Sequence, residues 1–172
     1  MKLRIILASI TVGVLLLASP TLARQGEKKE VPAKLAAPPV YDFRGLLQRL
    51  YDAWSDLDPA KAAPFYAKEA DRVFFDIAPL KYNGWAQYAE GVPKAFAAYS
   101  SGKFTLGKDL RVHRHGNLAW ATATWRGELL KKDGTKENVE GRYTVLLEKR
   151  GDDWLIVHEH MSVPAPPPPA PK

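Results

Sequence analysis

At 172 residues the chain has room for one domain of ordinary size. Cysteine is absent, so neither a disulfide framework nor a lipid-anchoring cysteine is possible. The net charge of +6 falls to +1 over residues 41–162, because the two ends of the chain carry the other positive charges. A nearly neutral domain lacks the basic stripe of a nucleic-acid-binding protein, which argues against nucleic acid as a partner.

The two ends of the chain lie outside the predicted domain. Residues 1–23 combine two early basic residues, a short apolar run and a final Thr-Leu-Ala, which is the pattern of a secretory signal peptide. The run is too short to span a membrane, so we expect a secreted or periplasmic protein with no membrane association after cleavage. Residues 24–40 predict a disordered linker, and residues 163–172 predict an extended, proline-rich tail.

The segment before residue 104 is predicted to form three helices, from apolar residues at helical spacing, and one short strand, from an aromatic run. The first helix begins after Asp42, a suitable N-cap, and ends near Ser55. Asp58-Pro59 begins a second, short helix as cap and first helical residue. A short aromatic strand over 72–76 follows, and then a helix over 85–99 that an internal glycine and proline should kink.

From residue 104 the pattern changes to strands. Turn residues separate four runs: 104–113, 118–130, 138–149 and 154–162. Helices followed by an antiparallel meander predict an α+β fold, with the helices on one face of a strongly curved sheet. The loop at Asp133-Gly134 allows two registers that place opposite faces inward. The inward-facing member of each pair, Trp120 or Trp125 and Arg142 or Tyr143, therefore stays open.

The last strand carries the candidate polar site. Strict alternation places one set of side chains on a common face: Trp154, Ile156, His158, His160 and Ser162. We expect this face to look into a cavity, with His158 and His160 as donors or acid–base groups and Ser162 as a ligand contact. Histidines that are satisfied by backbone carbonyls within the core are the alternative.

The four histidines form two pairs, His113-x-His115 and His158-x-His160. In the predicted meander these pairs are on the order of 20 Å apart, at about 3.3 Å per residue and about 4.8 Å per strand. Two ligands alone rarely hold a metal, so no metal is expected. No glycine-rich phosphate loop and no nucleophile signature occur, and no cofactor is expected either.

Asp76 is the candidate general base. It ends an aromatic strand, and apolar surroundings should raise the pKa of its carboxyl group. An aspartate that caps the turn before Pro79 is the alternative. The remaining candidate ligand contacts are aromatic: Trp54, Trp85, Trp125 and Tyr143.

Three segments together resemble the SnoaL-like proteins of the nuclear transport factor 2-like superfamily. Residues 55–59 read Ser-Asp-Leu-Asp-Pro, residues 73–85 begin Val-Phe-Phe-Asp and end Tyr-Asn-Gly-Trp, and residues 154–162 read Trp-x-Ile-Val-His-x-His-x-Ser. The resemblance covers residues 41–162. It implies a cone-shaped barrel, in which a mostly antiparallel sheet wraps around the N-terminal helices. It also implies a homodimer through the outer sheet face, which would cover Leu155, Val157 and Met161.

The ketosteroid isomerases of this superfamily have an aspartate base at the position of Asp76. Where those enzymes have an oxyanion-hole tyrosine and a protonated aspartate, this chain has about Gln48 and Thr144, which argues against a strict ketosteroid isomerase. We expect a small apolar or amphipathic molecule in the pocket, with isomerase, cyclase or hydrolase chemistry as the enzymatic form. A non-catalytic dimeric ligand-binding or association module is the alternative.

Overall fold

The computed structural model describes residues 40–165. The expected signal peptide over 1–23, nearly all of the expected linker and the tail beyond residue 165 lie outside these residues. The elements, in chain order, are α1 (Phe43–Ser55), α2 (Pro59–Ala62), the short 3-10 helix η1 (Ala63–Phe65), β1 (Val73–Phe75), β2 (Tyr82–Asn83), α3 (Gly84–Ala95), β3 (Tyr99–Leu106), β4 (Arg111–His115), β5 (Leu118–Lys131), β6 (Lys136–Arg150) and β7 (Asp153–Ser162).

The first two helices begin where their sequences predict, and the first also ends at Ser55 as expected. The Asp42 carboxylate accepts a hydrogen bond from the Gly45 N–H at 2.8 Å, which caps α1. Asp58 caps α2 in the same way, with Pro59 as its first residue. The apolar side of α1 is buried against the sheet and comprises Phe43, Leu46, Leu47, Leu50 and Tyr51.

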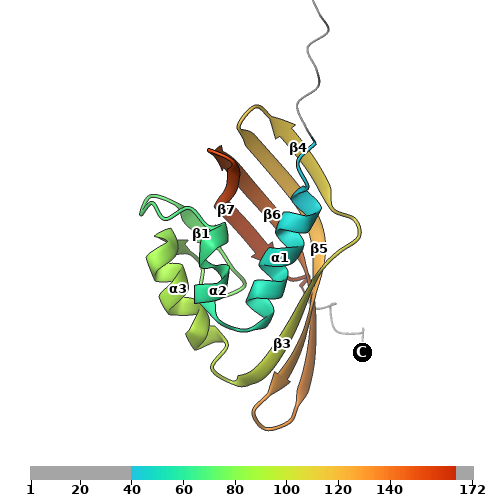
Figure 1. Cartoon of the computed structure of the whole chain (residues 1–172). Coiled ribbons are helices and arrows are strands. Elements are labelled where there is room, and N and C mark those ends of the chain that lie inside the picture. The colour runs from blue at the N-terminus through green and yellow to red at the C-terminus, as the bar shows by residue number, and fades with distance from the viewer. Residues whose placement is uncertain (1–39, 166–172) are drawn as a thin grey trace, which may run out of the picture. The chain divides into compact units, whose positions relative to one another are not determined.

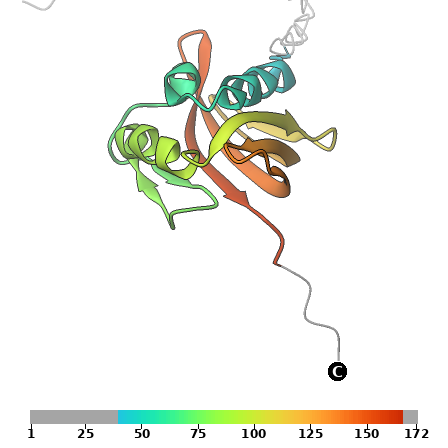
Figure 2. The same ribbon diagram turned by 90° about the horizontal axis from the view of Figure 1, so that it is seen from below.

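The seven strands form one mixed sheet in the order β2-β1-β7-β6-β5-β3, and β4 also pairs with β5. Only the β1–β7 pairing is parallel. The sheet is strongly curved without closing, and the helices lie on its concave side (Figures 1 and 2). The predicted α+β fold, with helices on one face of a curved and mostly antiparallel sheet, is confirmed.

Two predicted elements, the strand over 104–113 and the helix over 85–99, have other bounds in the structure, where β3 already begins at Tyr99. The run 104–113 is not one strand, because the chain leaves β5 after Leu106 and rejoins it at Arg111. The Asp109 carboxylate anchors the connection between β3 and β4 to β5, because it accepts hydrogen bonds from the backbone N–H and the hydroxyl of Thr124, at 3.0 and 2.9 Å. Helix α3 ends at Ala95 rather than 99, soon after its internal proline.

The long hairpin of β5 and β6 settles which aromatic residues face inward. Residues 132–135 connect the two strands, Leu130 pairs with Lys136, and burial alternates strictly along most of β5. Trp125 and Tyr143 lie on the concave side and are buried. Trp120 lies on the outer face with 45% of its surface exposed.

A β-bulge interrupts β7. Leu147 of β6 pairs with Ile156 and Leu146 pairs with His158, so Val157 is an extra residue without a partner across the strand. The side chains that alternate inward therefore change parity at this point. Trp154 and Ile156 are buried before the bulge, whereas Glu159 is buried after it.

Candidate functional site

A cavity of about 760 Å³ lies between α1, α3 and the concave face of the sheet. Helices α1 and α3 and strands β5 and β6 contribute most of its wall, and the end of β7 contributes Glu159 and Met161. Much of the wall is aromatic, including Tyr51, Trp54, Tyr88, Phe96, Trp125 and Tyr143. The cavity has the size and the mostly apolar wall of a small-molecule site.

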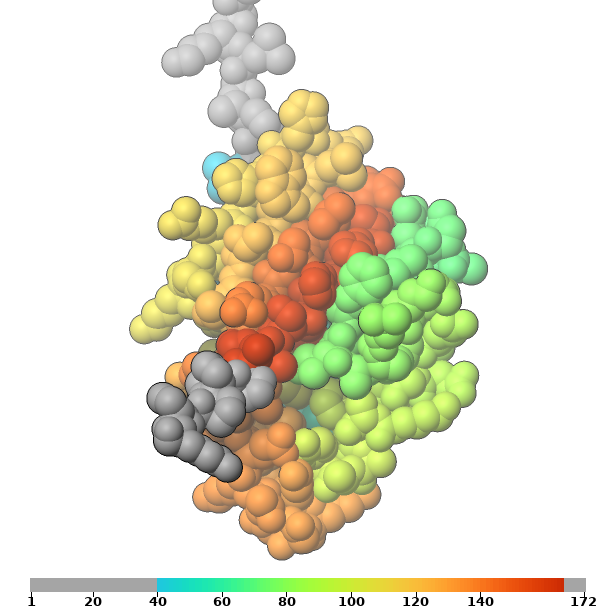
Figure 3. All heavy atoms as spheres, turned by 180° about the vertical axis from the view of Figure 1, so that it is seen from behind, coloured from blue at the N-terminus to red at the C-terminus, as the bar shows by residue number. Residues whose placement is uncertain are grey.

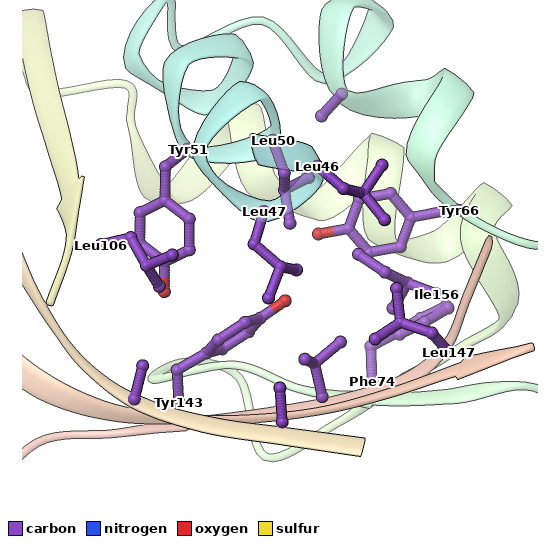
Figure 4. Close-up of a cluster of buried hydrophobic side chains, with 14 of the residues drawn as sticks. Leu46, Leu47, Leu50, Tyr51, Tyr66, Phe74, Leu106, Tyr143, Leu147 and Ile156 are labelled. Atoms are coloured by element: carbon purple, nitrogen blue, oxygen red, sulfur yellow. The ribbon is translucent and has the colours of Figure 1, made fainter. Parts of the chain in front are cut away.

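Glu159 occupies the buried end of this cavity with only 1% of its surface exposed. Its carboxylate accepts hydrogen bonds from three tyrosine hydroxyls: Tyr88 at 2.6 Å, Tyr143 at 2.9 Å and Tyr66 at 3.0 Å. In Figure 4 the hydroxyls of Tyr66 and Tyr143 point into the same space between α1 and the sheet. We call Glu159 and these three residues the glutamate–tyrosine cluster.

The protonation of Glu159 is balanced near neutral pH. The pKa of its carboxyl group is raised to about 7: burial is the largest cause and the nearby Asp76 charge adds to it, while the hydrogen bonds from the three tyrosine hydroxyls act in the opposite direction. No lysine, arginine or histidine of residues 40–165 lies within 4.0 Å of this carboxylate. The cluster therefore holds an uncompensated carboxyl group that exchanges its proton in the physiological range.

Asp76 lies at the cavity wall directly after β1, on the same side of the chain as the buried Phe74. Its carboxylate accepts a hydrogen bond from the Ile77 N–H at 2.7 Å. Burial raises the pKa of Asp76, and contacts with the Ile77 N–H and the Tyr88 hydroxyl partly offset that rise. The residue thus has the local contact of a turn cap and also the raised pKa of a candidate base.

A SnoaL-like domain family model matches residues 44–166. The chain belongs to the SnoaL-like family. No curated protein sequence matches the chain. The membership agrees with the resemblance of the three segments, and it assigns the fold to the nuclear transport factor 2-like superfamily.

Solved structures of this superfamily share the fold. A nuclear transport factor 2-like superfamily protein from Salmonella enterica is 24% identical with a TM-score of 0.64, over 70% of this chain and 87% of that one. A nuclear transport factor 2-like protein from Pseudomonas putida is 29% identical with a TM-score of 0.59, over 70% and 83%. The association domain of the C. elegans calcium/calmodulin-dependent protein kinase II is 18% identical with a TM-score of 0.56, over 71% and 93%.

In this SnoaL-like domain, four of the residues singled out from the sequence line the cavity: Asp76, Trp54, Trp125 and Tyr143. Trp85 does not line it and instead stacks on Tyr66, with ring centroids 4.5 Å apart. Ser162 also lies outside the lining, at the end of β7.

The expectation that His158 and His160 face the cavity is wrong. The bulge at Val157 reverses the alternation, so both rings lie on the outer face of the sheet. His158 Nδ1 is 2.7 Å from the Val73 carbonyl oxygen, which is the contact of a structural histidine, and His160 is exposed. Both rings pack edge-on against Phe75, at centroid distances of 5.4 and 5.6 Å. Met161, expected on the outer face, lines the cavity for the same reason.

Sequence reasoning missed the glutamate–tyrosine cluster. Glu159 stands between the two histidines in an otherwise apolar strand, and a carboxylate in that setting is a signal that could have been used. Tyr66 directly follows η1, Tyr88 lies on α3 and Tyr143 lies on β6, and no local pattern unites them. Residues 40–165 contain no group of three histidine, cysteine, aspartate or glutamate residues arranged to hold a metal ion.

The cluster can transfer protons to a bound molecule. When Glu159 is protonated, its O–H donates to one of the tyrosine hydroxyls, and that tyrosine can then turn its own proton away from the carboxyl group. Tyr88 and Tyr143 line the cavity, so either can present this proton to an occupant. Tyr66 does not line it, and its hydroxyl oxygen accepts a hydrogen bond from the Trp54 indole N–H at 2.9 Å.

Proposed function

We propose that this SnoaL-like domain binds a small, partly apolar molecule in the cavity and carries out acid–base chemistry on it. Asp76 acts as the base that removes a proton from the ligand. Glu159 acts as the acid, and its proton reaches the ligand through the hydroxyl of Tyr88 or Tyr143. The observation that supports this assignment is a buried carboxyl group, without a basic partner among residues 40–165, at the end of an aromatic cavity.

The two carboxyl groups differ in a way that suits them to opposite roles. Glu159 is fully enclosed and has a pKa of about 7, so a large fraction of it carries a proton at neutral pH. Asp76 is partly exposed and its carboxylate accepts a backbone hydrogen bond. Two titratable groups in one site, held at different pKa values by their surroundings, are a common arrangement in acid–base enzymes. Isomerisation, cyclisation and hydrolysis all use such a pair.

Binding can be tested with N-phenyl-1-naphthylamine, a neutral apolar dye that fluoresces on leaving water. We expect saturable binding of one dye per chain. Ala95 is exposed at the cavity wall, so Ala95→Trp should block entry, whereas Ala97→Trp, at an exposed position outside the wall, should not. Equal dye binding by both variants would contradict binding in this cavity. Mass spectrometry of molecules that co-purify with the protein then identifies candidate substrates for turnover assays.

A second candidate function is association through the outer sheet face, which no helix of residues 40–165 covers (Figure 3). This face exposes Leu118, Trp120 and Leu146 by 54%, 45% and 40%. The structural likeness to a kinase association domain supports a homodimer here. Sedimentation equilibrium should show a dimer at micromolar concentration, and Leu146→Asp should convert it to a monomer. A monomeric wild-type protein would refute this assignment.

Export is a proposal that rests on residues 1–23 alone. No helix of residues 40–165 has the length and apolarity needed to cross a membrane. N-terminal sequencing of the protein from its native cells should place the first residue after Ala23, and an intact N-terminus would contradict export.

A further inference from the structure

The charge of the cavity wall is one-sided. Four carboxyl groups line it, Asp76, Glu137, Glu140 and Glu159, and no lysine, arginine or histidine of residues 40–165 does so. Two of the four already have basic partners, because Glu137 pairs with Lys131 at 3.0 Å and Glu140 with Arg126 at 2.6 Å. The wall therefore keeps two carboxyl groups that no basic side chain of the described residues neutralises, Asp76 and Glu159.

The rest of the wall is rich in aromatic rings. Trp54 lies on α1, Tyr88 on α3 and Trp125 on β5, and Phe96 directly follows α3. Together with Tyr51 and Tyr143 they surround the space that Asp76 and Glu159 face. The negative face of an aromatic ring attracts an organic cation, and the attraction grows when the cation is removed from water. Aromatic rings combined with carboxylates, in the absence of basic groups, are the environment that recognises ammonium ions.

Two polar side chains of the cavity wall have no hydrogen-bond partner for their buried polar atoms among the described residues. The Tyr51 hydroxyl and the Trp125 indole nitrogen are both buried and have no hydrogen-bond partner among residues 40–165. Tyr51 is 4% exposed and Trp125 is 3% exposed, and both line the cavity. Buried polar groups are nearly always paired in folded proteins, so these two side chains of the cavity wall keep unused hydrogen-bonding capacity. The Tyr51 oxygen can accept from an ammonium N–H, and its proton can go to an acceptor on the same ligand.

We propose that the cavity is selective for organic cations, and that the ligand is a small amine or quaternary ammonium compound with an apolar body. The charged nitrogen lies near Asp76, with the Glu159 carboxyl group behind Tyr88, and the apolar body packs against the aromatic wall. An organic anion would meet the like charge of Asp76 and that of the ionised fraction of Glu159, and a neutral molecule would leave the Asp76 carboxylate uncompensated. This proposal rests on the proposed function, since it names the class of molecule that the same cavity binds.

Three probes of one shape test the charge preference directly. They are 4-phenylbutyl-trimethylammonium, its neutral isostere with carbon in place of nitrogen, and 5-phenylpentanoate. Isothermal titration calorimetry with the full chain at low salt and pH 7 should show that the cation binds at least tenfold more tightly than the isostere and that the anion binds weakest. Asp76→Asn should remove the tenfold advantage. The matched Asp52→Asn, which alters a carboxylate on α1 outside the cavity wall, should retain it.

Proton exchange on binding gives a second readout. A bound cation lowers the pKa of nearby carboxyl groups, so the ammonium probe should release protons at pH 7, and the measured heat should depend on the ionisation enthalpy of the buffer. The isostere should release none. Glu159→Gln should abolish most of the release, because Glu159 titrates at about this pH.

The outcomes separate this proposal from the function on which it rests. Equal binding of the cation and the isostere, or a preference for the anion, overturns the ligand class while leaving the cavity as a binding site. The same conclusion follows if the naphthylamine dye binds and none of the three probes does. If neither the dye nor any probe binds, the proposed function itself is refuted.

Discussion

The raised pKa of Glu159 predicts that the domain loses stability as the pH rises. A carboxyl group with a pKa of 4.5 in the unfolded chain and about 7 when folded binds more protons in the folded state between those values. Its contribution is therefore most favourable at low pH, and it is lost as the pH rises from about 4.5 through 7. One pKa unit corresponds to about 1.4 kcal/mol, so the free energy of unfolding should fall by about 2 to 3 kcal/mol between pH 5 and 8 on account of Glu159 alone.

Urea denaturation of the wild type and Glu159→Gln, at several values between pH 5 and 8, measures this change. The glutamine keeps the shape and cannot ionise, and every other titrating group is common to both proteins, so the difference between their curves reports Glu159. Glu90→Gln is the matched control. Lys94 lowers the pKa of this exposed carboxylate, so its curve should run parallel to that of the wild type. Parallel curves for wild type and Glu159→Gln would refute the raised pKa and, with it, the role of Glu159 as an acid near neutral pH.

Two further comparisons use matched pairs of substitutions measured by urea denaturation. Tyr143→Phe removes a donor to Glu159 and should cost about 1 to 2 kcal/mol at pH 8, whereas Tyr51→Phe removes no hydrogen bond to a described residue and should cost less than about 0.5 kcal/mol. Equal losses of unfolding free energy in the two variants would contradict the hydrogen bond assigned to Tyr143 and the absence of one between Tyr51 and any described residue. Gly141→Ala should cost about 1 to 3 kcal/mol, because its Cβ would lie 2.5 Å from a backbone carbonyl oxygen and an indole nitrogen. Gly127→Ala, whose nearest contact is a phenylalanine ring at 3.0 Å, should cost less, and the reverse order would refute the packing described here.

The elements that the sequence predicts well are those with local causes. Asp42 and Asp58-Pro59 mark helix starts because a carboxylate that accepts a backbone N–H within three residues needs no distant partner. The alternation along β5 is equally local, because one face of a half-buried strand must be apolar. The break between β3 and β4 has a distant cause instead, since Asp109 bonds to Thr124 of another strand.

The candidate site was only half predictable for the same reason. Asp76 could be predicted because the aromatic residues next to it in the sequence indicate apolar surroundings, and burial there does raise its pKa. The length of the β5–β6 connection determines whether Trp120 or Trp125 faces inward. It also determines whether Arg142 or Tyr143 does. A change of one residue in that length moves every side chain of the strand to the other face of the sheet, and the strand's own sequence does not reveal the length.

Strand β7 shows most clearly why the sequence alone does not determine which side chains face the cavity. Strict alternation from Trp154 gives the correct face as far as Ile156. One extra residue, Val157, then moves every later side chain to the opposite face, and a bulge requires only the loss of a local pairing. Burial of Glu159 is feasible because three hydroxyls, from residues 93, 71 and 16 positions away, converge on its carboxylate. His158 finds only a backbone carbonyl on its face. The position of the hydrogen-bond partners thus decides which residue of β7 faces inward. The proposed acid of this strand, Glu159, follows from the pairing of β6 with β7 and not from the two histidines beside it.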